Sequence, residues 1–176
     1  WAGILAGIYA ITGCLIAIFK YGLGFITPWT LQPVDSDTKA DLISIALIIL
    51  ILSIITAIWL SYQKSKKNRD NSWSLSSKAL ISNVSIPLFA GGFWILILLH
   101  KGHFEMVPAT SLVFYGLALY QAGNYTYKVL HIVGLLQIGL GLFCGYFVMY
   151  SLICWGLGFG LLHILYGSYI HFKYNK

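Results

Sequence analysis

Residues 42–62 contain no charged side chain, and a helix needs about 20 mostly apolar residues to cross a bilayer. The rest of the chain has the same character, because only 9% of its 176 residues are charged and 59% are hydrophobic. A soluble domain carries roughly a quarter charged residues. The composition therefore excludes a soluble enzyme, a soluble nucleic-acid-binding protein and a disordered chain, and it predicts a polytopic membrane protein.

Six segments are long and apolar enough to be predicted as membrane spans. They cover residues 2–27, 42–62, 79–99, 107–121, 129–148 and 151–172. The fourth is the shortest, and Pro108 near its start is well tolerated in a first helical turn. We therefore predict an all-α transmembrane helix bundle that forms a single domain over residues 1–176.

The charged residues are sorted between the connections. Residues 28–41 contain three aspartates and one lysine, whereas residues 64–78 contain four lysines, Arg69 and only one aspartate. The positive-inside rule places residues 64–78 in the cytoplasm, and with six spans both termini lie there too. The net charge of +6 is thus interpreted as membrane orientation and not as a sign of a nucleic-acid partner.

A weak internal repeat links residues 111–117 to residues 151–157 at an offset of 40. It suggests that spans three and four repeat as spans five and six, although a composition this biased also produces such matches by chance.

Paired glycines indicate close helix packing at the C-terminal end. Gly141 and Gly145 form one GxxxG pair, and Gly156 and Gly160 form another. Small residues four apart allow helix backbones to approach closely in lipid. Because the connection around residues 147–151 is short, spans five and six are expected to be antiparallel neighbours with these two pairs facing each other.

Gln137 and His163 lie about thirteen residues before and after the same connection. They should therefore lie at one depth, and an unpaired polar group in lipid costs several kcal/mol. We predict a hydrogen bond between them that stabilises packing, with a proton-relay or substrate-binding role as the alternative.

Lys20 and Asn83 are two further candidate polar groups within the membrane. Lys20 either extends to the outer interface or serves a function inside the first span. Asn83 precedes Pro87, which removes a helix hydrogen bond and predicts a kink. The predicted spans contain no carboxylate, which argues against ion-coupled transport.

The histidines and cysteines do not predict a bound metal. Cys14, Cys144 and Cys154 lie in apolar stretches without CxxC spacing. His131 and His171 lie near the predicted cytoplasmic interface, so haem ligation is a distant alternative. We expect no metal and no cofactor.

The C-terminal half resembles a group of uncharacterised integral membrane proteins of Bacteroidetes-type bacteria. The similarity lies in Ile86-Pro87-Leu88, Gly91-Gly92, Pro108-Ala109-Thr110, the segments 114–119 and 155–160, His163 and Tyr166-Gly167. The resemblance implies six spans in a bacterial inner membrane, and it implies no activity and no catalytic residues.

Two classes of function follow from these patterns. The first is a non-enzymatic accessory or regulatory bundle that binds other membrane proteins or a second copy of itself within the bilayer. The second is a small uncoupled transporter or channel with Lys20, Gln137, His163 and the break at Pro87 along its path. A cavity that reaches His163 or Asn83 would favour transport, and a dry bundle with an exposed glycine stripe would favour partner binding.

Overall fold

A computed structural model of the chain describes residues 1–21, 36–68 and 75–174, and within these ranges the regular elements are all helical. Short 3₁₀ turns, η1 (Phe104–Met106) and η2 (Val148–Tyr150), precede α4 and α6. The longer elements are α1 (Ala2–Tyr21), α2 (Ser36–Asn68), α3 (Leu75–His100), α4 (Val107–Ala122), α5 (Val129–Tyr146), α6 (Ser151–Trp155), the π-helix η3 (Gly156–Leu162) and α7 (His163–Tyr174).

Five helical segments of the described residues are long and apolar enough to cross a membrane. They are Ala2–Lys20, Ser36–Gln63, Ser77–His100, Val129–Tyr146 and Val148–Lys173. The predicted fourth span corresponds to α4, which has 16 residues and is about 24 Å long. The prediction of an all-helical chain with several helices able to span a membrane is therefore confirmed.

The helices differ from the predicted spans mainly at their ends. Helix α2 continues to Asn68, so the lysines at 64, 66 and 67 belong to a helix and not to a connection. Helix α3 continues through Pro87 as one element. The predicted first span extends to residue 27, and its residues 22–27 lie outside the described part of the chain.

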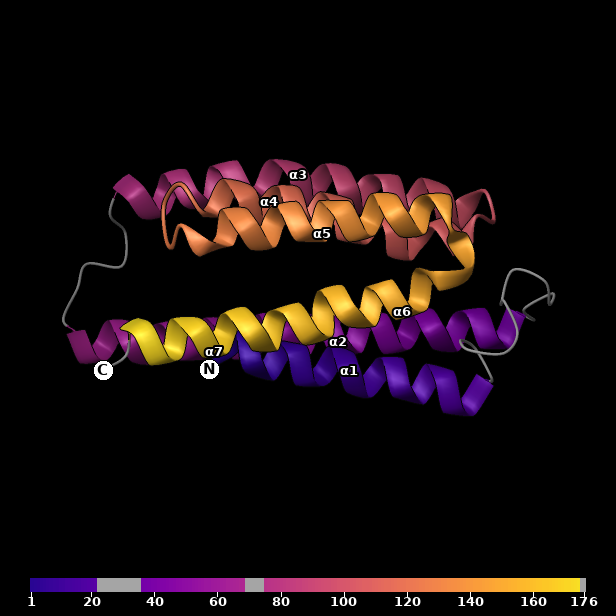
Figure 1. Cartoon of the computed structure of the whole chain (residues 1–176), viewed down its shortest axis with the longest axis horizontal. Coiled ribbons are helices and arrows are strands. Elements are labelled where there is room, and N and C mark those ends of the chain that lie inside the picture. Colours follow the sequence, from indigo (N-terminus) through magenta and orange to yellow (C-terminus); the bar gives the residue numbers. More distant parts are fainter. Residues whose placement is uncertain (22–35, 69–74, 175–176) are drawn as a thin grey trace.

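The helices form two layers (Figure 1). Layer A consists of α3, α4 and α5, in which α4 contacts both of the others. Layer B consists of α1, α2 and the continuous α6–η3–α7 segment, and there α1 contacts both α2 and the C-terminal segment. The connection from α5 to α6 joins the layers at one end (Figure 1). The two layers meet mainly where α6 contacts α4 and α5.

Each layer contains an antiparallel helix pair that is packed by equivalent contacts. A Cβ atom on Gly116 of α4 would lie 2.8 Å from the carbonyl oxygen of Gly134 in α5. A Cβ atom on Gly7 of α1 would lie 2.7 Å from the carbonyl oxygen of Gly160. The next neighbours are Ile138 and Ile164, each four residues beyond the contacted glycine. The α4–α5 pair and the pair of α1 with the continuous η3–α7 segment, which we call the α1–α7 pair, therefore share one packing arrangement.

The sequences of the second helix in each pair agree with this equivalence. Residues 134–141 read GLLQIGLG and residues 160–167 read GLLHILYG, so five of eight positions are identical at an offset of 26. Helices α1 and α4 run in opposite directions along the bundle (Figure 1). The two pairs are thus inverted with respect to each other. The segments predicted to repeat at an offset of 40 lie in α4 and across the boundary of α6 and η3.

The prediction that two glycine pairs face each other across the last hairpin is wrong. A Cβ atom on Gly141 would lie 2.9 Å from the Ala109 carbonyl oxygen, so this glycine packs against α4. A Cβ atom on Gly145 would also have Ala109 as its nearest neighbour. Gly156 and Gly160 pack against α1, at Cys14 and Ile11. The reason is that the hairpin separates α5 and α6–α7 into different layers.

Candidate intramembrane binding site

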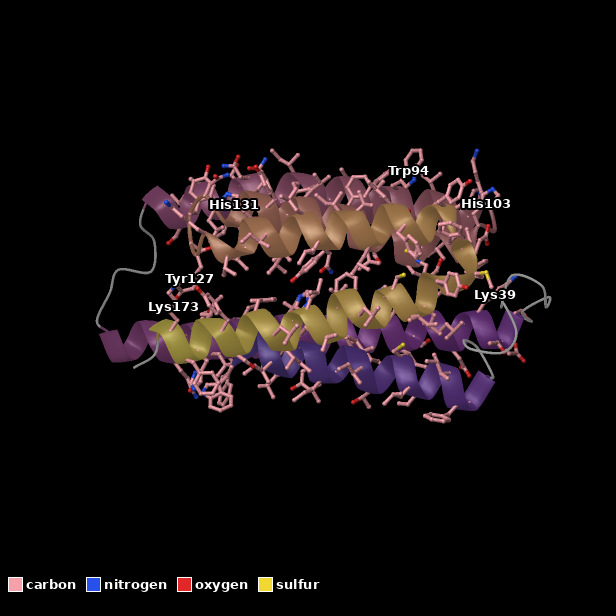
Figure 2. The ribbon with its side chains drawn as sticks, in the orientation of Figure 1. Lys39, Trp94, His103, Tyr127, His131 and Lys173 are labelled. Atoms are coloured by element: carbon pink, nitrogen blue, oxygen red, sulfur yellow. The ribbon has the colours of Figure 1, made fainter. Side chains whose placement is uncertain are left out.

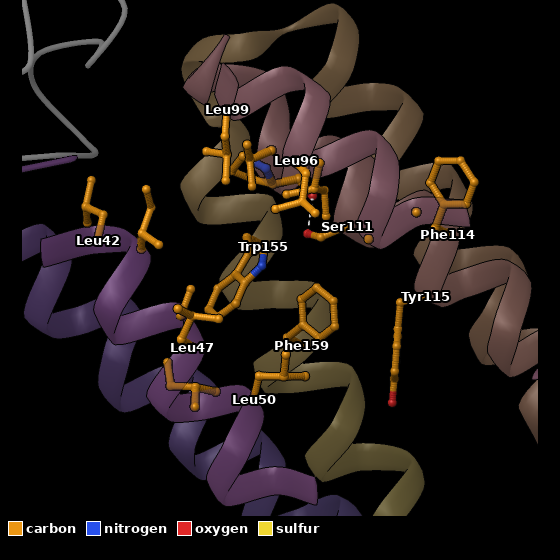
Figure 3. Close-up of a pocket in the computed structure, with 18 of the residues that line it drawn as sticks. Leu42, Leu47, Leu50, Leu96, Leu99, Ser111, Phe114, Tyr115, Trp155 and Phe159 are labelled. Atoms are coloured by element: carbon orange, nitrogen blue, oxygen red, sulfur yellow. Dashed lines mark hydrogen bonds between the residues drawn. The ribbon is translucent and has the colours of Figure 1, made fainter. Parts of the chain in front are cut away.

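A cavity of about 1160 Å³ lies between the two layers. Its walls come from α2, α3 and α4, with smaller contributions from α1 and from the C-terminal segment of layer B (Figure 3). Along α2 the lining extends from Lys39 to Ser53, which corresponds to about 21 Å of helix. The cavity therefore reaches from the connection between α3 and α4 well into the bundle.

Aromatic side chains form much of one wall. Trp155, Phe159 and His163 follow at four-residue spacing, with ring centroids 5.1 Å and 5.8 Å apart along the series. Tyr115 of α4 packs on Phe159 at 5.0 Å from the opposite layer (Figure 3). These contacts place a continuous aromatic surface from the last residue of α6 to the first residue of α7.

His163 lies at the deep end of this surface and is 3% exposed. Its Nδ1 atom lies 3.0 Å from the carbonyl oxygen of Gly158, and its Nε2 atom lies 2.8 Å from the Tyr115 hydroxyl. A carbonyl oxygen only accepts, so Nδ1 carries the proton and donates it. A doubly protonated ring would place a charge in the membrane, and no acidic partner lies against it among the described contacts. In the neutral ring Nε2 accepts, and the Tyr115 O–H donates.

The π-helix η3 immediately precedes His163. Single-turn π segments are rare and often occur at functional sites. Here the His163 ring takes the Gly158 carbonyl as its acceptor, which orients the imidazole toward layer A. The glycines of residues 156–160 keep this segment close to its neighbours, because a Cβ atom at Gly158 would collide with the Leu112 side chain.

The charged residues that line the cavity lie at its end next to the connection between α3 and α4, which we call its mouth. The Lys39 ammonium of α2 lies 4.8 Å from the ring centroid of Phe104 in η1, so it links layer B to layer A. Glu105 lies 3.4 Å from the His103 ring. Lys39 and His103 are at the same end of the molecule (Figure 2). The deep end, in contrast, contains the Tyr115–His163 pair.

The predicted hydrogen bond between Gln137 and His163 is wrong. His163 pairs with Tyr115 and Gly158, while neither amide atom of the fully buried Gln137 has a hydrogen-bond partner among the described residues. Both side chains nevertheless lie close to Gly158, since a Cβ atom there would lie 3.3 Å from Nε2 of Gln137. The hydroxyl of Tyr115, from α4, reaches the ring instead.

Lys20 and Asn83 lie away from the cavity lining. Lys20 is in the last turn of α1 and forms an exposed ion pair with Asp41 of α2 at 3.3 Å. The Asn83 amide donates to the Ala79 carbonyl and to the Tyr125 hydroxyl, both at 2.8 Å. These contacts hold helix ends together, and they do not bring Lys20 or Asn83 to His163.

Sequence reasoning missed Tyr115, Trp155 and Phe159. The spacing of Trp155, Phe159 and His163 was a usable signal, because residues four apart share one helix face. Tyr115 carried no such signal, since its proximity to His163 depends on the contact between layers. The three cysteines are buried and free, and the described residues contain no group of three or more metal-ligating side chains.

Comparison with known proteins adds no relative. No protein-family model, curated protein or solved structure matches this chain. The function therefore has to be argued from the cavity itself.

Proposed function

We propose that this protein is a non-enzymatic membrane protein that binds an amphipathic molecule in the cavity between its two layers. The observation that carries the proposal is the cavity of about 1160 Å³ that reaches the Tyr115–His163 pair. Sites for drug-sized ligands are about 300–1,000 Å³ and mostly apolar with a few polar groups. This cavity has that composition and is slightly larger, which suits a molecule with a long apolar chain.

The ligand enters from the bilayer, between α2 and α3. Both helices line the cavity although they belong to different layers. Both also expose many large apolar side chains outside the cavity lining, including Ile51, Ile55 and Trp94. Such surfaces are compatible with lipid, and a gap between them would admit a lipid chain sideways.

The topology that goes with this proposal has six spans in a bacterial inner membrane, with both termini cytoplasmic. Lys39 and His103 lie at one end of the bundle, and His131 and Lys173 lie at the other (Figure 2). The mouth of the cavity then opens toward the outer leaflet, and the lysine-rich end of α2 faces the cytoplasm.

Two exposed glycines provide a matched test. Gly92 lines the cavity and Gly139 does not, and neither would place a Cβ atom within 4 Å of a neighbour. The protein is reconstituted in liposomes with a diacylglycerol that carries a photoreactive diazirine in one acyl chain. We expect labelled peptides from the cavity walls, with much less labelling in Gly92→Phe and unchanged labelling in Gly139→Phe. Labelling confined to the outer faces, with the two variants alike, would contradict the proposal.

Uncoupled transport is a second candidate, and the inverted α4–α5 and α1–α7 pairs favour it. Inverted repeats in transporters allow two halves to move around a site near the middle of the membrane. A cysteine in place of Ser111 tests this in sealed vesicles with a membrane-impermeant maleimide. Transport predicts reaction from both sides of the membrane, and a pure binding protein predicts reaction from one side. The wild type is the control, because its three cysteines are buried.

The accessory role predicted from the sequence ranks below these two. It needs an exposed glycine stripe for a partner helix. Gly141, Gly156 and Gly160 are occupied by contacts within the chain. A pull-down that recovers a stoichiometric membrane partner with unlabelled cavity walls would restore this role.

A further inference from the structure

Two hydroxyl groups of α4 in the cavity wall have already committed their protons. Ser111 donates its Oγ–H to the Pro108 carbonyl oxygen at 2.8 Å. Tyr115 donates its O–H to Nε2 of His163 at 2.8 Å, because the opposite ring nitrogen donates to Gly158. The Tyr115 oxygen also lies against the Tyr166 hydroxyl. Ser111 is therefore no longer a donor, and its oxygen remains an acceptor.

Ser111 and Tyr115 are four residues apart on α4, so they lie on one face of the helix. Both line the cavity, as does His163. Figure 3 shows Ser111 and Tyr115 on the same side of the space that Trp155 and Phe159 border. The acceptor oxygen of Ser111 on this wall is complementary to a ligand that donates a hydrogen bond.

The charges of the cavity argue for an uncharged ligand head group at this depth. Its charged lining residues are Lys39 and Glu105, which lie at the mouth near Phe104 and His103. The Tyr115–His163 pair is neutral, so it offers no counter-charge to a phosphate or a carboxylate. Moving an isolated charge into an apolar environment is far more costly than moving a hydroxyl.

From these observations we infer that the cavity selects an uncharged lipid whose head group is a hydroxyl that donates to the oxygen of Ser111. This inference rests on the proposed function, because it needs a lipid-like molecule in the cavity. The apolar chains then extend along the aromatic wall toward Trp155 and the mouth. The Trp155 N–H, about two turns nearer the mouth than His163, is a donor for an ester carbonyl farther along the chain.

Three lipids with identical acyl chains test the head group. They are a diacylglycerol, the same molecule with its hydroxyl capped as an acetate, and a phosphatidylcholine. Each competes with the photoreactive diacylglycerol for labelling of the cavity peptides in the full-length protein. We expect the free hydroxyl to compete about three- to tenfold better than the acetate, as one hydrogen bond provides. The phosphatidylcholine is expected to compete least.

Two conservative variants locate the acceptor. Tyr115→Phe and Ser111→Ala keep the shape of the wall and remove one oxygen each. We expect the preference for the free hydroxyl over the acetate to fall in Ser111→Ala and to persist in Tyr115→Phe, while the acetate itself competes as in the wild type. Thermal unfolding in detergent verifies that each variant is folded.

The outcomes separate this inference from the proposed function. If none of the three lipids competes and the cavity peptides are not labelled, the binding function itself is wrong. If all three compete equally, or if the preference persists in Ser111→Ala, the cavity binds lipid and the hydroxyl selection by Ser111 is wrong. A long-chain alcohol as a fourth competitor distinguishes a single-chain ligand from a two-chain one.

Discussion

Gln137 and His163 occupy equivalent positions in the two layers, yet only His163 has a hydrogen-bond partner among the described residues. They are 26 residues apart, as are Gly134 and Gly160, which make the same helix contact in the α4–α5 and α1–α7 pairs. Tyr115 of layer A reaches His163. Gly7 and Gly116 correspond at an offset of 109 residues, and the same offset makes Ala6 of α1 the counterpart of Tyr115. The difference in pairing between His163 and Gln137 therefore arises from one aromatic residue.

Replacing Gln137 with Met is expected to stabilise the protein. A buried amide without a partner costs about 1–3 kcal/mol, and a thioether of similar shape removes that cost. The free energy of unfolding, measured by titration with a denaturing detergent, should rise. A fall would show that the amide is satisfied by water or by a bound molecule.

The hydrogen bond between Tyr115 and His163 is expected to show as a coupling energy. In a double-mutant cycle with Tyr115→Phe and His163→Phe, the interaction should be about 0.6–2 kcal/mol, as for other hydrogen bonds between membrane helices. Both replacements keep an aromatic ring against Phe159, so packing changes little. Additive effects on unfolding would mean that the bond does not form.

Alanine at Gly7 or at Gly116 is expected to destabilise the bundle to a similar extent. In both cases the new Cβ atom would approach a carbonyl oxygen of the partner helix to under 3 Å, at 2.7 Å and 2.8 Å respectively. Overpacking of this kind costs about 1–3 kcal/mol. Gly139→Ala is the control, because nothing lies within 4 Å of its Cβ position, and its helix should gain up to about 1 kcal/mol. Unequal losses at Gly7 and Gly116 would weaken the equivalence of the two pairs.

Lys39→Met is expected to open the mouth of the cavity. The substitution removes the cation that lies over Phe104 and links the layers at that end. Such contacts contribute about 0.5–1 kcal/mol at exposed sites. A cysteine in place of Ser111 should then react faster with a water-soluble maleimide than it does with Lys39 present. An unchanged rate would mean that contacts other than the one between Lys39 and Phe104 close the mouth.

Lys20→Met, in contrast, is expected to change stability little. The Lys20 and Asp41 side chains are 62% and 51% exposed, and exposed ion pairs contribute about 0–1 kcal/mol. Melting temperatures in detergent should agree closely with the wild type. A large loss would indicate that the Lys20–Asp41 pair is buried in an apolar environment, where the substitution leaves the Asp41 charge without its partner.

The sequence alone determined the class of the protein and most of its helices. Long uncharged segments such as residues 42–62 have no other stable environment than a bilayer, where each helix satisfies its own backbone hydrogen bonds. The common depth of Gln137 and His163 also followed from residue counting, because a helix has a constant rise. Such properties depend on one segment at a time.

The tertiary structure decided which faces meet, and here sequence reasoning failed. Gly141 and Gly160 were expected to face each other, but the turn between α5 and α6 directs them to α4 and α1. Tyr115 and the cavity were not foreseen, since both depend on how the two layers meet. In a chain whose helices are apolar on every side, periodicity does not distinguish a face toward lipid from a face toward another helix. The close contacts of glycine and the few polar side chains decide which faces pack together, and these contacts exist only in the packed bundle.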